Sequence, residues 1–380
     1  MKQSIRAQIL ILVIAVVGAL LVGAVLLLVV KANPITAYGA MLLGPFSSVY
    51  GLTETMVKAT PLMLVGLGIV IAFRAGILNI GAEGQMMMGS LAGTVFALAF
   101  PNLPAILLLP GSMLAGFIGG ALYGAIPGAL KAYLLVNEIL STIMLNAIAQ
   151  QLLTYLLRGP LIDPTEISYG TGFPQTKELA QAAWLPRLIP QTRLHLGLIL
   201  AIVLAVVVYY LLWRTVTGFR MRAVGAGPKA SRYSGIRVEK NMVLAMVLSG
   251  GFAGLAGIVE VLGIHHRLLN GITAGYGFTG IVVALFGRLH PLGVIPAAIL
   301  FGGMMLGADM MQRAVAIPAS LVTIVQGLMV LFVVGSDIFI RKPEWAERLR
   351  VRIFPGRKKN GGAPPPPTSQ PADRSEESAS

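Results

Sequence analysis

The sequence predicts an all-α fold: a polytopic membrane helix bundle of about ten transmembrane helices, with both termini cytoplasmic. Three properties of the 380 residues predict this class. Hydrophobic residues make up 56% and charged residues only 12%, whereas soluble domains average about 25% charged residues. Lipid can cover the outside of such an apolar bundle, which a soluble fold could not bury. Long apolar segments and an uneven distribution of lysine and arginine complete the pattern.

The first apolar segment, 9–30, is 22 residues long. It exceeds the ~7–15 residues of a signal-peptide core and ends without a cleavage pattern, so we expect it to remain as the first transmembrane helix. Nine further apolar segments follow, of which the eighth in the chain is short and interrupted by glycine. They cover 56–73, 78–100, 104–130, 139–157, 194–213, 241–264, 276–287, 292–308 and 315–340.

The positions of the cations predict the orientation. With a cytoplasmic N-terminus, 21 of the 29 Lys and Arg residues lie on the cytoplasmic side and eight on the outer side, as the positive-inside rule requires. The two basic clusters, in 214–240 and 341–359, share a side only if the short eighth segment is counted as a span. We therefore expect a cytoplasmic loop at 214–240 and an external loop at 158–193.

We expect two regions in the chain: a transmembrane domain, 1–342, and a cytoplasmic tail, 343–380. From about residue 360 the tail contains consecutive prolines and polar residues with nothing to bury, so disorder is expected there. The external loop at 158–193, rich in Pro and Gly, is either a connector or a contact for a partner, and it has room for short interfacial helices.

Composition argues against several classes of function. The net charge of +14 comes from cations between apolar runs, which is typical of membrane loops, so we do not expect nucleic-acid binding. Cysteine is absent from the sequence, which excludes disulfides and thiolate metal sites. The adjacent His265 and His266 would point about 100° apart on a helix and therefore seldom share a metal. We predict no metal site.

Glycines recur at every fourth position of the segment 104–130, and pairs with the same spacing occur in two later segments. Residues four apart lie on one helix face, where small side chains let neighbouring backbones approach closely. We expect tight helix packing at these glycines rather than a ligand role. The positions are Gly116, Gly120, Gly124 and Gly128, Gly250 and Gly254, and Gly303 and Gly307.

The segment 73–85, FRAGILNIGAEGQ, places glycines, two amides and a carboxylate next to and within membrane-depth sequence. A carboxylate there costs about 2.5–3.5 kcal/mol and each glycine weakens a helix by roughly 1 kcal/mol. Broken helices persist at membrane depth only when they are buried in protein or line a water-filled path. We predict that Asn79, Glu83 and Gln85 lie beside a translocation pathway. The alternative is that Glu83 pairs with Arg74 and fixes a bend between the second and third spans.

The fifth apolar segment begins with a polar run from Asn137 to Asn146. We predict that Asn146 joins the pathway, whereas Glu138 is a first-turn acid that the helix dipole favours. Glu260 and Asp309 lie toward the outer ends of their spans, where we expect solvated boundary charges.

The loop 214–240 is too long and too basic for a simple helix connection. Pro228 fits the first turn of a short helix that continues to Tyr233, and Gly235 can end it. Such a projecting helix suits docking into a groove on another protein. The alternative is a basic loop held at anionic lipid headgroups.

The chain lacks motifs for hydrolysis. No G-x-x-x-x-G-K-[ST] sequence occurs, so ATP hydrolysis by that route must come from another subunit. Neither H-E-x-x-H nor G-x-S-x-G occurs, and we predict no catalytic residues.

Three stretches of the chain carry a resemblance to a known family: NIGAEGQ in 73–85, RAVGAGPKASRYSGI in 218–236 and GFTGIVVALFGRLHPLG in 277–303. They resemble the permeases of ATP-binding cassette importers for sugars, nucleosides and branched-chain amino acids. The resemblance covers about 37–340. NIGAEGQ is most similar to the branch that carries nucleosides with a basic membrane lipoprotein-type receptor.

The resemblance implies an importer permease in the bacterial cytoplasmic (inner) membrane, moving nucleosides or otherwise simple sugars inward by alternating access. The implied partners are a cytoplasmic ATPase that uses ATP and Mg, a second and paralogous permease chain, and an external substrate-binding lipoprotein or periplasmic protein, with membrane lipids around the bundle. The implied ATPase contact consists of Gly225, Pro228, Ala230, Ser231, Tyr233 and Gly235.

The residues alone are also compatible with two other functions. An ion-coupled secondary transporter would use Glu83 or Asp309 as its coupling carboxylate. A structural membrane protein or assembly factor would not transport at all.

Overall fold

The computed structural model describes residues 17–18, 20–170 and 172–318, with isolated positions between 321 and 331. The described residues form helices, turns and two isolated bridges, and no strand occurs among them. The predicted all-α class is therefore confirmed. The predicted first span is only partly described, and the tenth span is described at scattered positions. The predicted tail, 343–380, lies outside the described residues.

Six helices are long and apolar enough to cross a membrane. Two shorter apolar helices, Leu20–Val29 and α12 (Tyr276–Phe286), accompany them, and α4 (Ala82–Ala99) completes the bundle. The match of α12 to the predicted short segment 276–287 is within one residue. The six are α3 (Val49–Arg74), α5 (Ala105–Leu134), α6 (Glu138–Arg158), α8 (Gly197–Arg214), α11 (Val238–Glu260) with its π-helical continuation η3 (Val261–His265), and α13 (Pro291–Val315).

The remaining elements are short. The predicted external loop, 158–193, carries two short helical elements, α7 and η2, while α2 and α9 were not predicted. Pro228 begins α10 and Tyr233 ends it, which confirms the predicted short helix in the loop 214–240. The bounds are α2 (Pro34–Leu43), η1 (Gly44–Phe46), α7 (Pro164–Ser168), η2 (Gln181–Ala183), α9 (Val216–Ala226) and α10 (Pro228–Tyr233).

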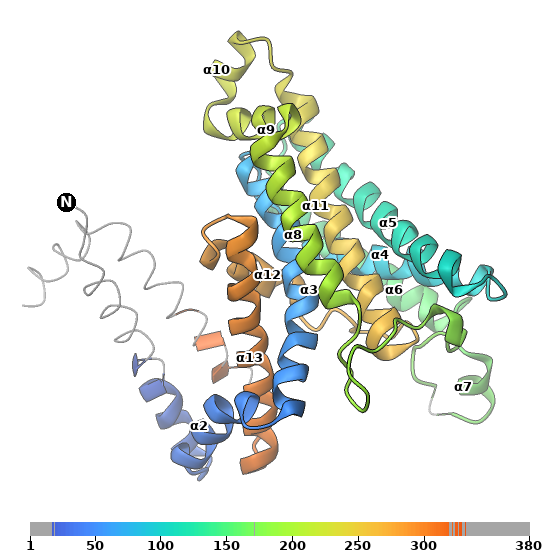
Figure 1. Ribbon diagram of the computed structural model, residues 1–380, viewed down its shortest axis with the longest axis vertical. Helices are drawn as coiled ribbons and strands as arrows, with labels where there is room; N and C mark the ends of the chain where they lie inside the picture. The colour runs from blue at the N-terminus through green and yellow to red at the C-terminus, as the bar shows by residue number, and fades with distance from the viewer. Residues whose placement is uncertain are drawn as a thin grey trace, which may run out of the picture.

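The helix α3 forms the centre of the bundle. In its most apolar 18-residue stretch, 83% of residues are buried inside the protein, against 17% for α6 at the periphery. It packs against α11, α13, α12 and α8. Figure 1 shows α9 and α10 together at one end of the bundle and α2 and α7 toward the other. We call these the α10 end and the α7 end.

The predicted glycine packing is confirmed between α5 and α11. A β-carbon added to Gly120 would lie 2.2 Å from the Gly250 carbonyl oxygen, and one added to Gly250 would lie 2.3 Å from the Gly120 oxygen. Gly254 faces Gly120 and Gly116 in the same way. Because any side chain here would meet backbone, these glycines allow α5 and α11 to pack closely.

The helix α3 begins seven residues before the predicted span, which started at residue 56. Charged Glu54 lies in this first part, and a hydropathy pattern ends a span at such a residue. The helix includes Glu54 because this charge pairs with Arg193, and Lys58, one turn further on, pairs with Asp309.

Candidate functional site

The polar segment predicted to be a broken helix separates α3 from α4. The helix α3 ends at Arg74, and α4 starts at Ala82. Gly76 has φ +79°, a left-handed conformation that favours glycine. The residues between the helices therefore leave their backbone groups without helical partners, and side chains must satisfy them.

The side chain of Asn79 makes several of the hydrogen bonds that hold this interrupted segment. It is fully buried, and its Nδ2 donates to Gln85 Oε1 and to Ser249 Oγ, both at 2.8 Å. Its Oδ1 accepts from Gln85 Nε2 at 3.1 Å and from the Gly81 backbone at 3.0 Å. Asn79 thus links the break to α4 and to α11.

Asn146 joins the same cluster from α6. Its Oδ1 accepts from the Gly84 N–H at 2.8 Å, and its Nδ2 donates to the Ile80 carbonyl at 3.0 Å. One side chain therefore satisfies a free N–H in the first turn of α4 and a carbonyl of the break. The side chain holds α6 against the point where the helix is interrupted.

Glu83 does not pair with Arg74. Its two carboxylate oxygens accept from the backbone N–H groups of Gly275, at 3.2 Å, and Gly277, at 2.8 Å. These groups belong to the start of α12, where a carboxylate is favoured by the helix dipole and by charge-assisted hydrogen bonds. Arg74 instead donates to the Leu289 carbonyl and lies over the Trp213 ring.

The four predicted pathway residues therefore come together. Asn79, Glu83 and Gln85 are buried, and Asn146 is half-buried beside them. Each is bonded to protein groups of the break, of α4, of α11 or of α12. The hydrogen bonds of this cluster hold the interruption between α3 and α4 against the start of α12.

The loop 214–240 folds into α9 and α10 at the α10 end (Figure 1). Pro228, Ala230, Tyr233 and Gly235 are exposed, and Tyr233 is 95% exposed. Ser231 is buried against the loop. Most of the predicted contact residues are thus exposed, whereas Ser231 packs inside the loop.

Gly225 anchors this loop to α3. A β-carbon at Gly225 would lie 2.1 Å from the Arg74 carbonyl oxygen and 2.9 Å from the Gly76 nitrogen. Only glycine permits this approach, so the end of α9 rests directly on the start of the helix break. The segment from Arg74 to Asn79 therefore connects the contact with Gly225 directly to the polar cluster.

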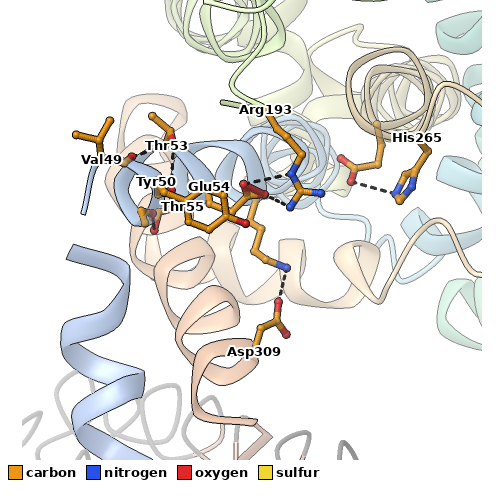
Figure 2. Close-up of polar contacts among 11 residues, drawn as sticks. Val49, Tyr50, Thr53, Glu54, Thr55, Arg193, His265 and Asp309 are labelled. Carbon is orange, nitrogen blue, oxygen red and sulfur yellow. Dashed lines mark hydrogen bonds and ion pairs between the residues drawn. The ribbon is translucent and has the colours of Figure 1, made fainter. Parts of the chain in front are cut away.

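A second polar cluster lies toward the α7 end. Figure 2 shows Glu54 and Arg193 facing each other, with Asp309 and His265 on different sides of this pair. The Lys58 ammonium lies 2.9 Å from Asp309, whose side chain is half exposed. Glu260 is buried, which corrects the expectation of a solvated boundary charge: the helix does not end at this residue but continues as η3 to His265, so Glu260 lies inside the protein.

Sequence reasoning missed Glu54, Lys58 and Arg193 as members of this cluster. Arg193 lies in the predicted external loop, more than a hundred residues from Glu54. The only signal was the presence of charges beside apolar segments, which does not identify partners.

Comparisons with known proteins decide the family. The family described as the permease component of branched-chain amino acid transport systems matches residues 51–334. The chain belongs to this permease family. The permease is 39% identical to the glucose ABC transporter permease TsgB13 of Haloferax volcanii, over 87% of this chain and 88% of that protein. It is 37% identical to the guanosine ABC transporter permease NupP of Bacillus subtilis, over 87% of this chain and 94% of that protein.

Bacillus subtilis has a second relative, the guanosine ABC transporter permease NupQ, which is 30% identical over 65% of this chain and 78% of that protein. No solved structure gives a significant match to the permease.

Membership of the family makes this chain a multi-pass membrane permease subunit of an ATP-binding cassette transporter. It is a transport component rather than an enzyme, and ATP use is expected of a separate ATPase. The pairing of NupP with NupQ implies a second permease chain beside the ATPase. The comparisons give no support to the ion-coupled alternative.

Proposed function

We propose that this permease carries nucleosides, or otherwise simple sugars, inward across a bacterial cytoplasmic membrane by alternating access. The observation that carries the proposal is the similarity along most of the chain to permeases named for guanosine and for glucose. Both solutes are small, polar and rich in hydroxyl groups.

The proposed topology has ten spans with both termini cytoplasmic, so that 1–342 is the transmembrane domain and 343–380 the tail. In this orientation the α10 end is cytoplasmic and the α7 end is external. This arrangement is supported by the positions of two loops: the basic loop 214–240 lies at the α10 end, and the loop 158–193 lies toward the α7 end.

The loop 214–240 is the proposed docking site for the ATPase, which binds ATP and Mg. The exposed residues of α10, among them Pro228, Ala230 and Tyr233, meet the ATPase, while Ser231 and Gly235 hold the helix and its end. Gly225 transmits movement because it lies against Arg74 and Gly76. Gly227 alone separates α10 from α9, so a shift of α10 would reach the break between α3 and α4 through a short path.

Asn79, Glu83, Gln85 and Asn146 are proposed to shape the pathway. Their bonds keep α4, α6, α11 and α12 in a fixed relation at the break. The second chain would be a paralogous permease, and an external binding lipoprotein or periplasmic protein would deliver the solute to the α7 end.

The solute class is tested with the assembled complex in proteoliposomes. ATP-dependent uptake of a labelled nucleoside, a hexose and leucine is measured side by side. We expect uptake of the nucleoside or the hexose, and its loss in Pro228→Arg. Asn102→Arg adds the same charge at an exposed position between α4 and α5 and serves as the control. Uptake of leucine alone would overturn the solute class, and full uptake by Pro228→Arg would overturn the docking site.

A further inference from the structure

A cavity of about 270 Å³ lies in the polar cluster toward the α7 end. It is slightly smaller than the ~300–1,000 Å³ of pockets for drug-sized ligands, so it suits a small solute. Its walls come from α3, the external loop, η3, the chain at 269–274 and the start of α12. The polar lining includes Glu54, Lys58, Arg193, Glu260, Asn270 and Tyr276.

Glu260 is the unusual member of this lining. Its side chain is only 7% exposed, and its ion-pair contact among the described residues, with His265 Nε2, is 3.8 Å long, beyond hydrogen-bonding distance. The structure shows no hydrogen bond to this carboxylate from any described residue. A buried carboxylate without a donor is costly, and native proteins normally provide one. The free side of Glu260 faces the cavity, so a donor must come from its contents.

The other charges in the cavity are already paired. Arg193 contacts both carboxylate oxygens of Glu54, and Lys58 is 2.9 Å from Asp309. An anionic solute would have to displace a carboxylate from these pairs, and a cationic solute at Glu260 would lie near the Lys58 and Arg193 cations of the same lining. A hydroxyl group would not disturb these pairs, because an ion-paired carboxylate keeps lone pairs that accept further hydrogen bonds. The lining thus favours an uncharged solute with several hydroxyl groups.

One wall of the cavity depends on the helix break. Tyr276 lies between Gly275 and Gly277, whose N–H groups are held by Glu83. A β-carbon on Gly277 would lie 2.4 Å from the Glu83 nitrogen, so the two segments are in direct contact. The predicted pathway residue Glu83 therefore positions a cavity residue without entering the cavity.

We propose that this cavity binds the hydroxylated ring of the transported solute, the ribose of a nucleoside or a hexose. Glu260 accepts from its hydroxyl groups, and Glu54, Arg193 and Asn270 complete the polar contacts. Val57, Ile264 and Ile272 provide apolar surface for the ring. This inference rests on the proposed function and adds to it the residues that touch the solute.

The absence of cysteine from the chain permits a direct test. His265→Cys places a single thiol in the cavity wall, at a side chain that is 34% exposed. Glu178→Cys, at a side chain that is 50% exposed and outside the cavity lining, is the matched control. Each variant is assembled with its partner chains, and labelling of this chain by a small hydrophilic thiol reagent is timed with guanosine, glucose, leucine or no solute.

We expect guanosine or glucose, at about ten times its dissociation constant, to slow labelling at position 265 by about tenfold. Labelling at position 178 should not change. Wild-type uptake is measured in parallel. If the wild-type complex transports a nucleoside or hexose but that solute leaves labelling at 265 unchanged, the cavity proposal is overturned and the proposed function stands. If the complex transports neither solute, the proposed function fails and the cavity proposal fails with it. Protection by leucine alone would also overturn the proposal.

Discussion

The amide side chains of Asn79 and Gln85 bond to each other in both directions, from Asn79 Nδ2 to Gln85 Oε1 at 2.8 Å and from Gln85 Nε2 to Asn79 Oδ1 at 3.1 Å. Both side chains are buried at the point where α3 gives way to α4. This pair supplies the polar partners that an interrupted helix needs in an apolar surrounding.

Replacing Asn79 with leucine should destabilise the permease. The change leaves Gln85, Ser249 and the Gly81 N–H without a partner, and each unsatisfied buried group costs about 1–3 kcal/mol. Unfolding by SDS in mixed micelles measures the loss. Asn102→Leu is the control, because Asn102 is exposed. Equal unfolding curves for the two variants would contradict the assigned role of Asn79.

Replacing Glu83 with glutamine should loosen the start of α12. The neutral amide has only one acceptor oxygen for the N–H groups of Gly275 and Gly277, and charge-assisted hydrogen bonds are roughly twice as strong as neutral ones. Hydrogen exchange at residues 275–277 should accelerate, and uptake should fall. The control Glu138→Gln changes a carboxylate that pairs with Lys131 far from α12. Unchanged exchange in Glu83→Gln would show that the carboxylate does not hold this helix.

Replacing Gly225 with alanine should uncouple ATP hydrolysis from uptake. The new β-carbon would meet the Arg74 carbonyl oxygen at 2.1 Å, so α9 must move away from α3. Gly227→Ala is a matched control, since its β-carbon would meet only Ala230, at 3.8 Å. We expect the ratio of solute transported to ATP hydrolysed to fall in Gly225→Ala and not in Gly227→Ala. The same ratio in both would rule out transmission through this contact.

The stability of the permease should fall in mild acid because of His195. Burial, together with nearby His266, lowers the pKa of His195 to about 4. In the unfolded chain a histidine titrates near 6.5, so the folded state binds fewer protons between these values. Stability is then fully present above pH 6.5 and declines as the pH falls toward 4, by roughly 3 kcal/mol in total.

His195→Gln removes this titration. Thermal unfolding of the detergent-solubilised proteins at pH 7.5 and pH 5 should therefore show a smaller acid shift in the variant than in the wild type. Parallel shifts would mean that other groups account for the acid sensitivity.

The sequence predicted those features that depend on local pattern. The spacing of Gly116 and Gly120 indicated close packing, and Pro228 with Gly235 predicted α10. The early start of α3 could not be predicted, because Glu54 stays in a helix only through Arg193, a residue of a distant loop. The helix α9 has no strong apolar face to reveal it, since basic residues and glycine interrupt its sequence.

In the candidate site, too, only the features that form a local sequence pattern could be predicted. The polar segment around Asn79 was recognisable because its residues are costly in a membrane span. The partner of Glu83 was not, because backbone N–H groups of Gly275 and Gly277 leave no mark in the sequence. The cavity around Glu260 draws its walls from five separate segments, and only the tertiary fold brings them together.

A separate ATPase is expected to drive transport through this permease. The most direct measurement is solute uptake by the reconstituted complex with ATP supplied to the ATPase side, with ion gradients collapsed, and with a partner ATPase whose Walker A lysine is replaced. Uptake should persist without ion gradients and disappear with the ATPase variant. Uptake that survives the ATPase variant and requires an imposed ion gradient would contradict this expectation.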